Sequence, residues 1–191
     1  SGYVTVKPDN YKIGQMLAEQ LIQNDTEQLE NKKIGVVLGR AETEEAANRI
    51  AGLKDGLEGY DCEIAWEYNY AGGNQNISDI IASKEQVDYL AVLDNWALEE
   101  LGEAAEENKY HGAQIYGVGS SEKAIVLLDN QNIKCLLVPD DYEMGYKSMD
   151  EIAKKLEHSF YKMNSCETKV KTIYKEDLYS KDIERFLYSY E

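Results

Sequence analysis

Basic residues are scarce in this sequence. Twenty Lys and Arg stand against 36 Asp and Glu, which gives a formal net charge of -16 at pH 7. Such a surface repels the phosphates of nucleic acids and anionic membranes, so we expect no nucleic-acid partner. Proline is scarce too: Pro8 and Pro139 are the two in the chain, and no tract rich in Pro, Gly or Ser divides it. The sequence therefore predicts a single unit over residues 1–191.

Cysteine and long apolar runs are also sparse. Cys62, Cys135 and Cys166 lack the spacing of a metal site, and three thiols do not indicate a disulfide framework. The longest apolar stretches, Ala124–Leu128 and Cys135–Val138, are far shorter than the ~20 residues that cross a bilayer. The sequence predicts no metal, no cofactor and no membrane-spanning helix.

The 191 residues are 43% hydrophobic, enough for one core at ~150 residues per domain. Short apolar runs typical of buried strands alternate with stretches that carry apolar residues at helical spacing. The expected strands are Tyr3–Lys7, Lys33–Leu38, Glu63–Tyr68, Tyr89–Leu93, Gln114–Val118 and Lys134–Val138. The expected helices follow them: one carrying Ile13, Leu17 and Leu21, then Thr43–Gly59, Ile77–Ser83, Trp96–Asn108, Ser121–Asp129 and Asp141–Glu157.

Strands separated by helices must cross over and run parallel, and right-handed crossovers place helices on both faces of the sheet. The predicted fold is therefore α/β, a doubly wound parallel sheet in three α/β/α layers. Residues 158–170 break the alternation. We expect a further strand at Val170–Tyr174 and a closing helix at Ser180–Tyr190.

Sequence motifs of common enzymes are missing. No G-x-G-x-x-G follows the first full strand, and neither G-x-x-x-x-G-K-[ST] nor G-x-S-x-G occurs. The two histidines, His111 and His158, lie outside the loops that follow strands. The sequence therefore predicts a protein that is not an enzyme. One alternative stays open, a flavodoxin-like enzyme that binds a flavin or phosphate at Gly117–Ser121.

Polar and aromatic residues cluster in the loops where a parallel sheet binds ligands. Arginine forks and carboxylates bind hydroxyl pairs, and an indole stacks on a sugar ring, so this set suits a sugar-like ligand. Structural roles compete: Arg49 can pair with Glu45, Trp96 can pack on the sheet, and Asp140 can cap a helix. The candidate ligand-binding residues are Arg40, Arg49, Asp94, Asn95, Trp96, Ser120 and Asp140.

Several segments in order resemble the type I periplasmic-binding-protein fold, shared by sugar-binding proteins of ABC transporters and effector domains of lactose-repressor-like regulators. They are VTVKPDNYKIGQMLAEQL, the R-x-x-G of Arg49–Gly52, VDYLAVLDNWALEELGEA, and IYGVGSSEKAI followed by NIKCLLVPDDYEMGYKSM. The resemblance makes Arg49 the counterpart of a sugar-contacting arginine. Three positions depart from the family pattern, because its asparagine falls on Leu93, its aspartate on Gly119, and its glutamine or asparagine on Pro139.

The resemblance also implies that this chain corresponds to the later part of the family's proteins, without their first lobe. In the family, the counterpart of residues 141–169 crosses over to pack on that lobe. The apolar stripe of this segment, Met149, Ile152, Ala153 and Leu156, needs a partner. We expect the helix to fold back onto this sheet or to pack against a second copy of the chain, as a homodimer.

The sequence and the resemblance together predict the solute-binding module of an extracytoplasmic ABC-transporter receptor. Its partners would be a sugar-like small molecule and, through the full-length protein, a membrane permease. The alternative is a metabolite-sensing effector domain of a LacI-type regulator, which would be cytoplasmic.

Overall fold

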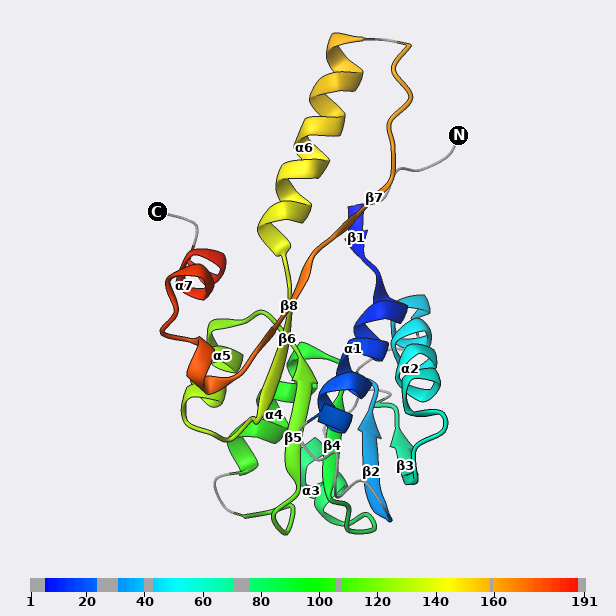
Figure 1. Ribbon diagram of the computed structural model, residues 1–191, viewed down its shortest axis with the longest axis vertical. Coiled ribbons are helices and arrows are strands. Elements are labelled where there is room, and N and C mark those ends of the chain that lie inside the picture. Colours follow the sequence, from blue (N-terminus) through cyan, green and yellow to red (C-terminus); the bar gives the residue numbers. More distant parts are fainter. Residues whose placement is uncertain are drawn as a thin grey trace.

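The computed structural model describes residues 6–23, 31–39, 43–70, 76–105, 108–158 and 160–188. Strands and helices alternate through most of the chain (Figure 1). The strands are β1 (Val6–Pro8), β2 (Lys32–Val37), β3 (Cys62–Tyr68), β4 (Tyr89–Val92), β5 (Gln114–Val118), β6 (Cys135–Pro139), β7 (Cys166–Thr168) and β8 (Val170–Ile173). The helices are α1 (Asn10–Gln23), α2 (Glu44–Leu57), α3 (Ile77–Ala82), α4 (Asn95–Ala105), α5 (Glu122–Asp129), α6 (Asp141–Glu157) and α7 (Lys181–Leu187), with a 3-10 turn at Lys175–Asp177.

The main sheet has the strand order β3-β2-β4-β5-β6-β8, and its first five strands run parallel. Along β4, Leu90 and Val92 face one core while Tyr89 and Ala91 face the other, as the two-residue period of a strand requires. Helices α1 and α2 enclose one core, and α3, α4 and α5 enclose the other. The predicted α/β fold with helices on both faces is confirmed.

Two strands differ from the expectation. The first strand does not join the main sheet: β1 pairs in parallel with β7 in a separate two-stranded sheet, in the register Val6↔Cys166. The expected start of that strand, Tyr3, lies outside the described residues. The late strand β8 forms where Val170–Tyr174 was expected, but it pairs antiparallel with β6, Pro139 opposite Val170. Its direction reverses because the chain leaves the sheet through α6 and returns beside it.

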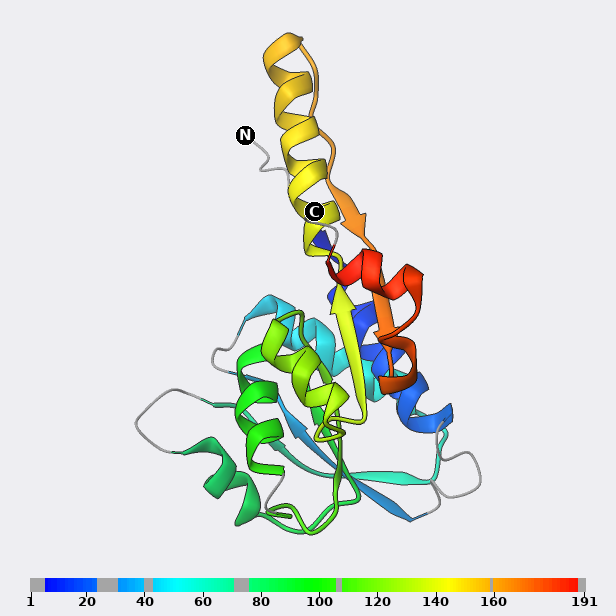
Figure 2. The ribbon, with the colours of Figure 1, turned by 90° about the vertical axis from the view of Figure 1, so that its left-hand side faces the viewer.

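Helix α6 and residues 160–168 form an arm that projects from one end of the sheet (Figures 1 and 2). The arm is held by polar contacts along one face of α6. Glu151, which is 8% exposed, accepts hydrogen bonds from the Tyr161 hydroxyl at 3.0 Å and the Asn164 backbone N–H at 2.7 Å. Nearer the sheet, Glu143 Oε2 accepts from the backbone N–H of Lys169 at 3.0 Å.

The opposite, apolar side of α6 is exposed. Met149 is 68% exposed, Ile152 46% and Leu156 82%, and Tyr146 beside them is 65% exposed. The expectation that this helix folds back onto the sheet is therefore wrong. Its polar face, which carries Glu143 and Glu151, is the one that binds the returning chain, and the apolar stripe faces outward. Among the described residues, no helix is long and apolar enough to span a membrane.

Candidate binding site

The strand order changes direction between β2 and β4, which are neighbours in the sheet although β3 lies between them in sequence. A parallel sheet binds ligands at such a point, beyond the carboxyl ends of the strands. Gly39 follows β2 and Asp94 follows β4 at this edge. A Cβ added to Gly39, whose φ is +102°, would lie 2.5 Å from Asp94 Cβ. The two loops therefore meet closely at the switch point.

Arg49 reaches this edge from α2. Its Nε donates to Asn10 Oδ1 at 2.8 Å, and its Nη1 donates to the Leu93 carbonyl oxygen at 2.6 Å. Burial lowers the pKa of the Arg49 guanidinium, and the carboxylates of Asp94 and Glu45 oppose that shift. A guanidinium has five N–H donors, so these two bonds leave three for other acceptors.

Glycines bring α1 and α2 close enough for this contact. A Cβ on Gly52 would lie 1.9 Å from the Tyr11 carbonyl oxygen, and one on Gly14 would lie 2.0 Å from the Arg49 carbonyl oxygen. Only a residue without a Cβ fits at such distances. The R-x-x-G spacing thus places the arginine at the rim and the glycine at the helix contact, one turn apart.

Asp94 and Asp140 both act at helix N-termini. Asp94 Oδ2 accepts from the Ala97 backbone N–H at 3.0 Å, and Asp140 Oδ1 accepts from the Glu143 backbone N–H at 2.8 Å. The capping alternative is therefore confirmed for Asp140. For Asp94 the cap uses one carboxylate oxygen, and the Asp94 charge also reaches Arg49. Whether either carboxylate contacts a ligand stays a prediction.

Asn95 and Trp96 begin α4. Asn95 Oδ1 accepts from the backbone N–H groups of Ser120 at 3.0 Å and Ser121 at 3.3 Å. These donors, which the flavodoxin-like alternative would offer to a phosphate, are thus already engaged by the protein. Trp96 is half-buried against Tyr70, with ring centroids 4.8 Å apart and an interplanar angle of 37°.

The structure thus brings Arg49 and Asp94 together at the β2–β4 edge, with Asn95 and Trp96 next in the chain and Ser120 across from Asn95. Asp140 stands apart at the base of the arm. Arg40 lies outside the described residues.

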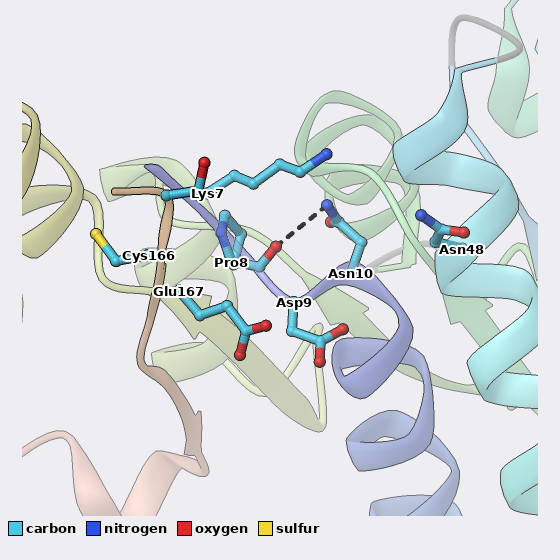
Figure 3. Close-up of a pocket in the computed structure, with 8 residues that line it drawn as sticks. Lys7, Pro8, Asp9, Asn10, Asn48, Cys166 and Glu167 are labelled. Carbon is cyan, nitrogen blue, oxygen red and sulfur yellow. Dashed lines mark hydrogen bonds between the residues drawn. The ribbon is translucent and has the colours of Figure 1, made fainter. Parts of the chain in front are cut away.

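A hollow of about 490 Å³ opens beside this edge, between β1, β7 and the starts of α1 and α2 (Figure 3). Figure 3 shows the Lys7 side chain extending toward Asn10 and Asn48. The lining residues are Lys7, Pro8, Asp9, Asn10, Asn48, Ser165, Cys166 and Glu167.

Asn10 connects the hollow to the rim, because its side chain lines the hollow and holds Arg49. It is 5% exposed. Sequence reasoning missed Asn10 as a site residue. A signal was present: Asn10 precedes Ile13, Gly14 and Leu17 on the buried face of α1, where a polar side chain needs a polar partner.

The arrangement offers hydrogen bonds and an aromatic pair. Within the described ranges, no three His, Cys, Asp or Glu side chains gather in a group that could hold a metal ion. The three cysteines are free thiols, and burial raises the pKa of the Cys135 thiol to about 12.

Comparisons with known proteins identify the family of the chain. The model of a periplasmic binding protein domain matches residues 1–159, and the chain belongs to this family. No sequence among curated proteins matches. The family is one of binding proteins, and its fold, an α/β lobe with a parallel-dominated sheet, is the one described above.

Similar solved structures share the fold at low sequence identity. One is a carbohydrate transporter solute-binding protein from Agrobacterium radiobacter in complex with D-arabinose, with 18% identity, a TM-score of 0.80, and coverage of 96% of this chain and 65% of that one. A glucose-galactose binding protein from Geobacillus stearothermophilus has 18% identity, a TM-score of 0.77, and coverage of 93% and 64%. A protein from Bacteroides fragilis, described as a LacI transcriptional regulator without experimental assignment, has 12% identity, a TM-score of 0.77, and coverage of 92% and 63%. The chain thus spans less than two thirds of each of these proteins.

Proposed function

We propose that this chain is the ligand-binding lobe of an extracytoplasmic solute-binding protein of an ABC transporter, and that its ligand is a sugar or a similar polyol. The contact of Arg49 with Asn10 and Leu93 at the β2–β4 edge carries the proposal. It presents a guanidinium with N–H donors that no described residue engages beside the Asp94 carboxylate, and sugar hydroxyls bind such mixed sets. The similar transporter proteins that bind D-arabinose, or glucose and galactose, support this ligand class.

The proposal includes a second lobe. The solved transporter proteins have about a third of their length beyond the matched region, and the arm of α6 and residues 160–168 has an exposed apolar stripe. We propose that this stripe packs on a first lobe and that the ligand is held between the two. Closure of the lobes over the ligand would then be the signal that a membrane permease recognises.

Titration calorimetry tests the proposal. A two-lobed, N-terminally extended protein should release or take up heat with D-arabinose, D-glucose or D-galactose, and R49Q should abolish the signal. R185Q provides a matched control, because Arg185 is an exposed arginine on α7, away from the β2–β4 edge. The sugar assignment fails if a panel of sugars, polyols and nucleosides gives no heat with the unmodified protein.

A metabolite-sensing effector domain of a LacI-type regulator is the second candidate. The Bacteroides fragilis protein supports it, because its TM-score of 0.77 equals that of the glucose-galactose binding protein. The two candidates differ in what precedes the lobes in the parent gene. A helix-turn-helix segment there would identify a regulator, and an export signal would identify a transport receptor.

A further inference from the structure

We propose that Asn95 is a positioning residue of the binding rim, which acts by holding the β5–α5 turn and does not itself contact the ligand. The sequence pattern alone makes Asn95 a ligand-binding candidate. The structure shows that most of its side-chain hydrogen-bonding capacity is used within the protein. The effect on ligand affinity rests on the proposed function, whereas the effect on the turn does not.

The carboxamide of Asn95 makes three hydrogen bonds, which tie the start of α4 to the β5–α5 turn. Its oxygen accepts from the backbone N–H groups of Ser120 and Ser121, at 3.0 and 3.3 Å. Its nitrogen donates to Glu99 Oε1 at 2.7 Å, one turn along α4. An amide oxygen has two lone pairs, so both are engaged, and the bond to Glu99 fixes which end of the amide faces the turn.

Gly119 leaves the space that the Asn95 side chain occupies beside the turn. A Cβ at position 119 would lie 2.4 Å from Asn95 Oδ1 and 3.3 Å from Leu98 Cδ2. The turn can approach α4 this closely only if residue 119 has no side chain.

The hydrogen bonds of Asn95 to the β5–α5 turn also fix the positions of the residues next to Asn95. Backbone N–H groups at the start of a helix are a ready binding site for a ligand oxygen, and α5 starts immediately after Ser121. The Asn95 oxygen fills that place. Because Asn95 is fixed at both ends of its amide, the backbone that carries Asp94 and Trp96 is fixed as well. Ligand recognition on this side then falls to those two residues and Arg49.

The test reverses the direction of the hydrogen bond between positions 95 and 99. N95A removes all three bonds and should weaken sugar binding of the two-lobed protein by about tenfold. N95D keeps an acceptor for the turn but opposes two carboxylates. N95D/E99Q lets the new amide at position 99 donate to the new carboxylate at position 95, and we expect it to restore affinity to within about twofold of the unmodified protein.

A matched control uses another glutamate of the same helix. Glu103 pairs with Lys123 at 2.8 Å and does not contact Asn95, so N95D/E103Q should stay as weak as N95D. If Asn95 instead touched the ligand through its N–H donors, N95D/E99Q would lack that donor and would not recover. Failure of that rescue overturns the positioning role.

Hydrogen–deuterium exchange of the Ser120 and Ser121 amides gives a second readout, which needs no ligand. Both amides should exchange at least about tenfold faster in N95A and return to the original rate in N95D/E99Q. Unchanged exchange in N95A overturns the proposal, as does faster exchange with unchanged affinity. If the unmodified protein binds no sugar, the proposed function fails and so does the role in affinity, while accelerated exchange in N95A would still show that Asn95 holds the turn.

Discussion

Gly52 on α2 lies against the backbone of Tyr11 on α1, so closely that a Cβ at position 52 would be 1.9 Å from the Tyr11 carbonyl oxygen. This approach sets the distance between the two helices and so the distance between Arg49 and Asn10. A helix contact in one core thereby determines the geometry of the rim.

Substituting Gly52 should lower the stability of the protein and disturb the contact between Arg49 and Asn10. We expect G52A to lower the free energy of unfolding by about 3 kcal/mol, because the methyl group meets backbone atoms that cannot move alone. Urea unfolding measures the loss. G145A is the matched control: Gly145 is also helical, nothing lies within 4 Å of an added Cβ, and alanine there should stabilise α6 by up to ~1 kcal/mol. Equal effects of the two substitutions would contradict the close packing of α1 on α2.

The contact between Arg49 and Asn10 should be visible in stability even without ligand. R49Q leaves the buried Asn10 oxygen and the Leu93 carbonyl without this donor, and we expect a loss of about 1–3 kcal/mol in the free energy of unfolding. A double-mutant cycle with N10A should give a coupling of about 1 kcal/mol. R185Q should change the unfolding free energy by less than about 0.5 kcal/mol. Additive effects of R49Q and N10A would show that the two side chains do not interact.

The sequence predicted the sheet better than it predicted the strand pairs outside it. The main-sheet strands can be recognised from the local sequence. In β4, for example, the residues on both faces of the strand are apolar. Strands β1 and β7 have three residues each and pair across the chain, Val6 with Cys166. The sequence predicts a strand at Tyr3–Lys7 but not its pairing with β7, because that pairing forms where α6 and the returning chain pass β1.

The site residues, too, could be predicted only where the local sequence determines their position. Asp94 could be placed at this edge because it directly follows the parallel strand β4, whereas Arg49 lies on α2 and was identified through the R-x-x-G resemblance. Asn10 could not be placed, because its role depends on how closely α1 approaches α2, which is a property of glycines on both helices. Asn95 was expected at the rim, but the direction of its amide became visible only with the β5–α5 turn in place.

The arm should respond to acid. The pKa of the Glu151 carboxyl lies below its ordinary value, chiefly because the Asn164 backbone N–H donates to it, with help from the Tyr161 hydroxyl. A lowered folded-state pKa means that this contribution to stability is complete above the unfolded pKa and is lost as the pH falls through the folded one. We therefore expect the arm to loosen below about pH 4.

The amide chemical shift of Asn164, followed by NMR between pH 7 and pH 3, measures this change. E151Q should remove the titration of that amide. E157Q should leave it intact, because Glu157 lies on the same helix but is exposed. An unaltered titration in E151Q would mean that another group holds the returning chain.

Substitutions in the exposed apolar stripe of α6 should hardly change the stability of this chain, but they should destabilise a two-lobed protein. Leu156 is 82% exposed and Met149 68%, so L156K and M149K should each change the unfolding free energy of the present chain by less than about 0.5 kcal/mol. If the stripe packs on a first lobe, the same substitutions in an N-terminally extended protein would bury a charge in an apolar interface and cost about 2 kcal/mol or more each.

Urea unfolding of both forms separates the two cases, and V126K is the control for an exposed apolar residue elsewhere. Val126 is 56% exposed on α5, so lysine there should be tolerated in both forms. Size-exclusion chromatography with light scattering adds a further comparison. If L156K converts a dimer of the present chain into a monomer while the extended protein is unaffected, the partner of the stripe is a second copy, and the first-lobe interface proposed for residues 141–169 is wrong.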